Sequence, residues 1–142
     1  EVFTDKKPFV KYWLHTAMLL HLGEKMAKSL GNLVMVDSLL KKYSANEIRW
    51  LLLSHHYRKP WEFDENELRK AQNNISLVLR TIKNGSRKPK TKMKNSHLKH
   101  FTSLMDDDLN TPNVLKFILH SSKTSLQRQT ITSFLSILGF IM

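Results

Sequence analysis

DENELRKAQNNISLVLRTIKNG, residues 64–85, is the stretch that decides the fold of this 142-residue chain. Its apolar side chains recur three and four positions apart, which is the period of a helix with one buried face. That face consists of Leu68, Ala71, Ile75, Val78 and Ile82. We expect Asp64 and Glu67 to cap the start of the helix, and the Asn84-Gly85 pair to end it. A single apolar stripe needs partner helices, so the sequence predicts a mainly α fold.

Three more helices are expected after this one. The first places Leu98, Phe101 and Met105 on its inner face. The second begins at Thr111-Pro112, read as an N-cap and a first-turn proline, and runs to about residue 123. The last begins near residue 125 and buries Leu126, Ile131, Phe134, Leu135 and Leu138. Together these helices form an antiparallel bundle, which we expect to be incomplete because the chain ends in the apolar run SILGFIM.

Shorter elements are expected before residue 64. Ser44 and Glu47 have the spacing of a capping box, which predicts a helix with one apolar face. That face is formed by Ile48, Leu51, Leu52 and His55. Asp37 should cap a shorter helix that runs to residue 43. We expect a helix end at residues 8–14, a strand at 18–22 and an extended connection at 60–63, with all three tryptophans packed in the core.

The charge of the chain is strongly positive and uneven. Lys and Arg number 23 against 12 Asp and Glu, which gives a formal net charge of +11. Ten of the basic residues follow Glu67 in a stretch that has no acidic residue before Asp106. Residues 86–96, SRKPKTKMKNS, form a basic, proline-containing linker in that stretch. A positive field of this kind attracts polyanions, so nucleic-acid binding is favoured over a merely solvated loop.

Composition excludes several other classes. There is no cysteine, so the chain can hold neither a disulfide nor a thiolate zinc site. No apolar run reaches the roughly 18 residues that a membrane-spanning helix needs, so no membrane partner is expected. The chain begins with Glu1, and we expect it to be an internal piece of a longer protein.

The stretch GEKMAKSLGN, residues 23–32, is the candidate for chemistry. Lys25 and Lys28 lie three positions apart on a loop flanked by glycines, and Ser29 follows directly. Phosphoryl and nucleotidyl transfer need mobile positive charge where negative charge develops on the leaving pyrophosphate, and a lysine on its long stem can supply it. The Walker pattern is absent. On these residues alone, a solvated surface turn is the alternative.

Four motifs carry a family resemblance. KMAKS at residues 25–29, followed by LGN, resembles the KMSKS loop of class I aminoacyl-tRNA synthetases, with Ala27 in place of the central serine. Three further stretches resemble the cysteinyl-tRNA synthetases in particular: KYWLHTAMLL at 11–20, SHHYRKPWEF at 54–63 and MDDDLNTP at 105–112. The resemblance covers nearly the whole chain and is weakest in the linker and at the end.

The resemblance implies a function and roles for particular residues. The family activates cysteine with ATP, which binds with Mg²⁺, and transfers cysteine to the terminal ribose of tRNA(Cys). Lys28 and Lys25 would be the catalytic residues: Lys28 would contact ATP and stabilise the transition state, while Lys25, with Ser29, would assist phosphate binding and loop closure. The whole loop would bind ATP, through Lys25, Met26, Ala27, Lys28 and Ser29. Alanine at position 27 keeps the loop small, and we expect function to be retained.

The resemblance also implies a division into domains. Residues 1–32 would be the end of the catalytic domain, 33–63 a stem-contact segment, and 64–142 a helical bundle of the DALR, anticodon-binding type. The HIGH motif and the zinc ligands of the family would lie upstream, so this fragment should be inactive alone, and no metal site is expected in it. The intact protein would be a cytoplasmic monomer. tRNA contacts would come from Arg58, Arg87, Lys88, Lys90, Lys92 and Lys94.

Two alternatives stay open at this point. One is the related ligase that joins cysteine to an amino-sugar inositol in mycothiol synthesis, which shares the lysine loop and needs no tRNA. The other is a non-catalytic tRNA-binding helical module in which KMAKS is incidental. The basic linker argues for a tRNA partner.

Three further features have a structural and a functional interpretation. The acidic run at residues 106–108 is more typical of helix capping than of magnesium binding. His55 and His56 have no carboxylate near them in the sequence, which disfavours zinc. Arg58 is equally compatible with a structural tie in the stem-contact segment and with an RNA phosphate contact.

Overall fold

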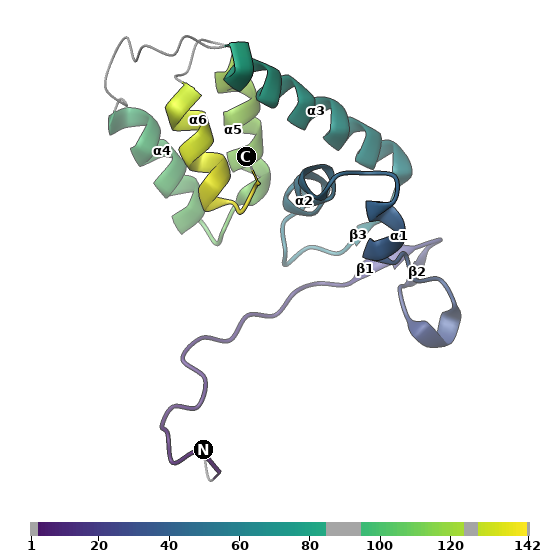
Figure 1. Ribbon diagram of the computed structural model, residues 1–142. Coiled ribbons are helices and arrows are strands. Elements are labelled where there is room, and N and C mark those ends of the chain that lie inside the picture. Colours follow the sequence, from purple (N-terminus) through teal and green to yellow (C-terminus); the bar gives the residue numbers. More distant parts are fainter. Residues whose placement is uncertain (1–2, 85–94, 124–127, 142) are drawn as a thin grey trace.

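The computed structural model describes residues 3–84, 95–123 and 128–141, and these are mostly helical (Figure 1). The elements in chain order are β1 (Leu19–His21), β2 (Glu24–Lys25), a 3-10 turn η1 (Lys28–Leu30), α1 (Val36–Leu40), α2 (Ala45–Leu53), β3 (Trp61–Glu62), α3 (Glu65–Asn84), α4 (Asn95–Asp106), α5 (Thr111–Lys123) and α6 (Arg128–Ile137). The mainly α prediction is confirmed. In the part of the chain that is described, no helix is long and apolar enough to cross a membrane.

Helix α3 is the central element, and its sequence pattern is fully realised. All five predicted stripe residues are buried, and they face α2, α5 and α6. Asp64 caps the helix as expected, because its Oδ1 accepts a hydrogen bond of 2.8 Å from the Asn66 N–H. Glu67 was expected to join this cap, and that expectation is wrong: its carboxylate lies 2.9 Å from Nε2 of His55.

Helices α5 and α6 pack against α3, while α4 packs against α5 and, through an aromatic contact, against α6. Phe101 of α4 stacks on Phe134 of α6 with 4.3 Å between the ring centroids. Helix α4 begins at Asn95, inside the stretch expected to be linker, and Leu98 is 40% exposed rather than inward-facing. In α6, Ile131 and the residue pair at 134–135 are buried as predicted. Leu126 lies outside the described residues.

The turn between α4 and α5 differs from its prediction by one residue. Thr111 is the first residue of α5, and Asn110 precedes it. The Asn110 side chain accepts a hydrogen bond of 3.4 Å from the Asn113 N–H, which is the bond that an N-cap makes. Asn110 therefore caps α5, and Pro112 still lies in the first turn.

Helix α2 begins at the predicted capping box. Ser44 Oγ accepts a hydrogen bond from the Glu47 N–H, and the Glu47 carboxylate accepts one from the Ser44 N–H. The expected apolar face is only partly correct, because Leu52 is 50% exposed while its neighbour Leu51 is 2% exposed. Trp50 is buried and packs against Phe140, which brings the end of the described chain onto α2. His55 lies beyond the end of the helix.

The three strands form a small sheet in the order β2-β1-β3, with β1 antiparallel to β2 and parallel to β3. The strand at 18–22 and the extended connection at 60–63 are thus confirmed. Helix α1 begins after Met35, and Asp37 lies within its first turn, so Asp37 is not the expected cap. The helix also ends at Leu40, short of residue 43.

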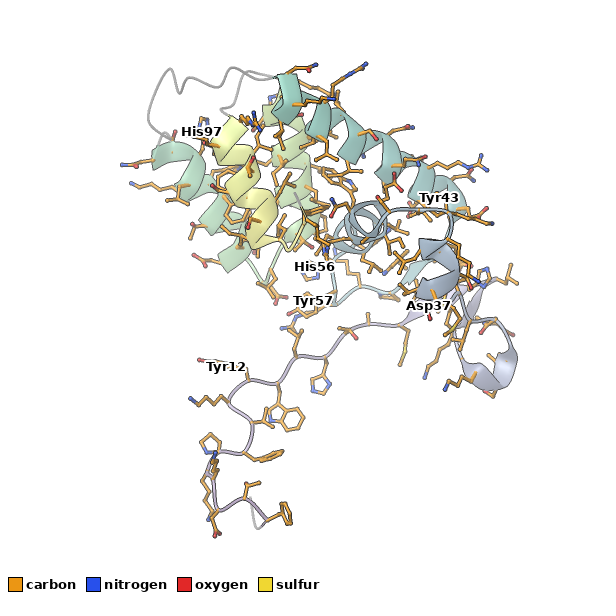
Figure 2. All side chains as sticks on the ribbon, viewed as in Figure 1. Tyr12, Asp37, Tyr43, His56, Tyr57 and His97 are labelled. Atoms are coloured by element: carbon orange, nitrogen blue, oxygen red, sulfur yellow. The ribbon has the colours of Figure 1, made fainter. Side chains whose placement is uncertain are left out.

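Residues 3–16 run as a segment without helix or strand that leads away from the helices (Figure 1). The helix end predicted at residues 8–14 is therefore wrong. Tyr12 projects from this segment in Figure 2, and Trp13 is 77% exposed, so the expectation that Trp13 is a core residue fails. Phe9, Tyr12 and Trp13 do follow the helical spacing, but all three are exposed, because apolar neighbours in the sequence do not show whether another part of the chain covers a residue.

Candidate nucleotide-binding loop and its surroundings

The lysine loop connects β2 to α1 and lies at the edge of the molecule (Figure 1). The β1–β2 hairpin turns through Leu22 and Gly23, which have φ values of 58° and 78°. After β2, the chain makes the short 3-10 turn η1, and Gly31, with φ of 65°, ends it. The Gly31 N–H donates to the Lys28 carbonyl at 3.2 Å. The loop is therefore a defined turn.

The predicted site residues divide into two groups by exposure. Lys25, Lys28 and Ser29 are exposed, whereas Met26 and Ala27 are half-buried. Lys25 lies at the end of β2, and Lys28 is the first residue of η1. The loop thus presents two cationic side chains and a hydroxyl to solvent from a packed base, which suits contact with phosphate oxygens. Their role in ATP binding stays a prediction.

Asn32 organises this loop, and the sequence reasoning did not single it out. Its Oδ1 accepts a hydrogen bond of 2.9 Å from the Ala27 N–H, and its Nδ2 donates to the Lys25 carbonyl at 3.1 Å. Nδ2 also lies 3.5 Å from the His21 carbonyl. In the sequence, Asn32 is marked only by its position as the last residue of LGN, residues 30–32, which follows KMAKS.

A second tether joins the hairpin to β3. The Glu62 carboxylate accepts a hydrogen bond of 2.9 Å from the Gly23 N–H, across 39 residues of sequence. His21 and Phe63 meet edge to face, with ring centroids 5.9 Å apart. The base of the lysine loop is therefore fixed to the segment that immediately precedes α3.

The motifs HYR and MDDDLNTP, more than 40 residues apart in sequence, meet in space. Tyr57 donates a hydrogen bond to Oδ1 of Asp108, and Arg58 Nε lies 2.7 Å from Oδ2 of the same carboxylate. The rings of His56 and Tyr57, both labelled in Figure 2, stack with 5.1 Å between their centroids. These contacts join the segment before β3 to the turn that links α4 and α5.

The protonation equilibria of this junction follow from its hydrogen bonds. The bond from Tyr57, followed by that from Arg58, lowers the pKa of Asp108. Accordingly, the bond to Asp108 is the main cause that raises the pKa of Tyr57 and of Arg58. All three groups are solvent-accessible, so the charges are screened and the contact acts chiefly by geometry.

Arg58 is thereby placed in a structural tie, because its Nε contacts Asp108 and, at 2.8 Å, the Tyr57 hydroxyl. Contact of Arg58 with RNA stays a prediction. The other predicted RNA contacts, Arg87, Lys88, Lys90, Lys92 and Lys94, lie outside the described residues.

The histidines and the acidic run have local partners. His55 faces Glu67 and stacks on Trp61 with 3.9 Å between ring centroids, while His56 Nε2 lies 3.9 Å from Asp108. The fold therefore brings a carboxylate close to each of the two histidines, although none lies near them in the sequence. Within residues 3–84, 95–123 and 128–141, no three His, Cys, Asp or Glu side chains group as a metal site. Asp107 accepts a hydrogen bond from the Asn110 side chain.

A family model matches residues 1–73, a segment that includes the lysine loop and its tethers. Its description is the catalytic domain of the class I (C) tRNA synthetases. The chain belongs to this family. The matched segment ends within α3, so the match covers the lysine loop, the sheet and α2 together.

Relatives of this class I synthetase chain extend the similarity to the helical part. It is 35% identical over 141 residues to the cysteine–tRNA ligase of Methanococcus aeolicus, covering 86% of this chain and 28% of that protein. The ligase of Legionella pneumophila strain Corby is 35% identical over 95% of this chain and 31% of its own length. The ligase of Dehalococcoides mccartyi is 39% identical over 87% of this chain and 28% of its own length. The chain thus spans less than a third of the length of these relatives.

Proposed function

We propose that this chain is part of a cysteine–tRNA ligase, which activates cysteine with ATP and transfers it to tRNA(Cys). The observation that carries the proposal is the match of residues 1–73 to the class I (C) catalytic domain, together with relatives that are named cysteine–tRNA ligases. The exposed lysines of the loop in this matched segment support it.

The lysine loop would act as the KMSKS loop of this ligase. When ATP, with its Mg²⁺, reacts with the cysteine carboxylate, negative charge builds up on the departing pyrophosphate. Lys28 and Lys25 would place their ammonium groups against those oxygens, and Ser29 would add a hydroxyl donor. Met26 and Ala27, the half-buried residues between the lysines, would complete the ATP-binding loop. Zinc ligands, as in the family, would come from other parts of the protein.

The tRNA would be bound by the remainder of the chain. We assign residues 1–32 to the catalytic domain, 33–63 to the stem contact and 64–142 to an anticodon-binding type bundle. The net charge of +11 and the stretch between Glu67 and Asp106 that lacks acidic residues supply the electrostatic attraction. This basic character favours a tRNA acceptor over the amino-sugar inositol of the mycothiol-type ligase.

The test is Lys28→Ala in the intact ligase. Loss of a charge that acts on the transition state should slow cysteine-dependent ATP–pyrophosphate exchange by about 100-fold or more, while tRNA affinity changes little. Lys41→Ala, at an exposed position that follows α1, is the matched control and should leave the exchange rate unchanged.

An unaltered exchange rate in Lys28→Ala would refute the role of the loop. Binding of tRNA without any cysteine-dependent exchange in the intact protein would favour the non-catalytic module. Transfer of cysteine to an amino sugar, with tRNA inert as acceptor, would favour the mycothiol-type ligase.

A further inference from the structure

We propose that Asn32 is a positioning residue that sets the backbone of the lysine loop so that Lys25 and Lys28 meet the phosphates of ATP together. The inference rests on the proposed function of the loop, and it assigns to the side chain of Asn32 a role that acts through the two lysines.

The first observation is that one amide group binds the loop on both sides of Met26. Oδ1 accepts from the Ala27 N–H at 2.9 Å, and Nδ2 donates to the Lys25 carbonyl at 3.1 Å. A side-chain amide is one of the few groups that accept and donate at adjacent atoms. Aspartate has the same shape, but its carboxylate cannot donate to the carbonyl.

The second observation is that Asn32 is itself held in place. Its backbone carbonyl lies 2.9 Å from Nδ1 of His21, and its Nδ2 lies 3.5 Å from the His21 carbonyl. His21 belongs to β1, the middle strand of the sheet. The side chain of Asn32 therefore attaches the loop to the sheet. Within the sheet, the Glu62 carboxylate of β3 accepts a hydrogen bond from the Gly23 N–H of the hairpin.

The third observation is the path of the chain between the tied points. Gly31 adopts φ of 65°, and a Cβ placed there would meet open space. Glycine is thus suited to this position by its backbone conformation, which returns the chain from η1 to Asn32. The hydrogen bonds of Asn32 thus fix the loop backbone at Lys25 and Ala27. The side chains of Lys25 and Lys28 are exposed to solvent, where they can reach a ligand.

Such an arrangement reduces the conformational freedom that ATP binding would otherwise have to remove. Catalytic groups displaced by about 1 Å can lose on the order of 100-fold in rate. Because Asn32 is a neutral group that holds only backbone atoms, it contributes by positioning the lysines.

The experiment uses the intact ligase with Asn32→Ala and Asn32→Asp. Asn32→Ala should speed hydrogen exchange of the Ala27 amide and lower kcat for ATP–pyrophosphate exchange by roughly 10- to 100-fold, with a smaller change in the KM for cysteine. Asn32→Asp keeps the acceptor for the Ala27 N–H, so the amide should stay protected while kcat still falls. Asn46→Ala is the matched control, because the Asn46 amide likewise binds backbone atoms, those of Ile141, far from the loop.

A double-mutant comparison separates positioning from general stabilisation. If Asn32 acts through the two lysines, Asn32→Ala should have little further effect on kcat in a background in which Lys25 and Lys28 are both replaced by alanine. Multiplying losses would overturn the inference, as would an unchanged Ala27 exchange rate in Asn32→Ala. If kcat is normal in Asn32→Ala but reduced in Lys28→Ala, the inference about Asn32 is overturned while the proposed function of the loop stands. A normal kcat in Lys28→Ala would overturn the proposed function and the inference with it.

Discussion

Two adjacent leucines of α2 offer the sharpest test of the packing. Leu51 is 2% exposed and Leu52 is 50% exposed, although both lie in the same helix turn and were both expected on its apolar face. Leu51→Ala and Leu52→Ala are chemically identical changes with the same effect on helix propensity. Any difference in unfolding free energy between the variants therefore measures what covers each side chain.

The size of the difference follows from burial. Removing three carbons from a fully buried side chain costs about 2.4 kcal/mol in transfer free energy. The cavity left behind adds to this, so Leu51→Ala should lose roughly 2.5–5 kcal/mol. Leu52→Ala gives up only about half of the transfer term and leaves no cavity, which predicts about 1 kcal/mol.

Urea unfolding followed by helical circular dichroism measures both losses. With a urea dependence of about 2 kcal/mol per molar, a loss of roughly 2.5–5 kcal/mol in Leu51→Ala should lower the midpoint by about 1–2.5 M. Leu52→Ala should shift the midpoint by a fraction of that. Equal shifts, or a larger shift in Leu52→Ala, would refute the described orientation of α2.

Two smaller changes test the cap of α2 and the junction. Ser44→Ala removes the oxygen that accepts from the Glu47 N–H and should cost about 1 kcal/mol in urea unfolding, whereas Ser76→Ala on the exposed face of α3 should cost less than about 0.5 kcal/mol. The pKa of Asp108 is lowered by hydrogen bonds from Tyr57 and Arg58, so the folded pKa lies below the unfolded one. Its stabilisation is then present above about pH 4 and is lost as pH falls through the folded pKa. Thermal melts from pH 3 to 7 should therefore show Asp108→Asn less stable than the parent at pH 7, with the gap closing towards pH 3; a constant gap would contradict this.

Local patterns predicted the elements that depend on near neighbours in sequence. The buried stripe of α3 was correct at every position, because a 20-residue helix repeats its apolar period several times. The capping box of α2 was also correct, since both of its hydrogen bonds are made within four residues. These features need no knowledge of the tertiary arrangement.

The errors occurred where burial or pairing depends on distant parts of the chain. The period shows which side of a helix is apolar, but not whether anything covers it, and so Leu52 and Leu98 were placed inward. Glu67 suits the first turn of a helix, yet it binds His55, a partner that only folding brings near. For the lysine loop, the residue types were visible in the sequence, whereas the hold of Asn32 on the backbone was not.

The junction at Asp108 shows how distant motifs can depend on one another. Asp108 and Leu109 have φ values of 49° and 53°, so two consecutive residues other than glycine adopt the left-handed conformation. Aspartate tolerates this conformation better than leucine, for which it costs on the order of 1–2 kcal/mol. The turn is held because Tyr57 and Arg58 bind the Asp108 carboxylate, and the Leu109 N–H donates to the Met105 carbonyl at 3.0 Å. Residues 57 and 58 lie shortly before β3, and Glu62 of β3 binds the Gly23 N–H of the β1–β2 hairpin, so the segment 57–62 contacts both the loop and the helical bundle. Residues 57–62 thus form a continuous connection from the α4–α5 turn to the base of the loop.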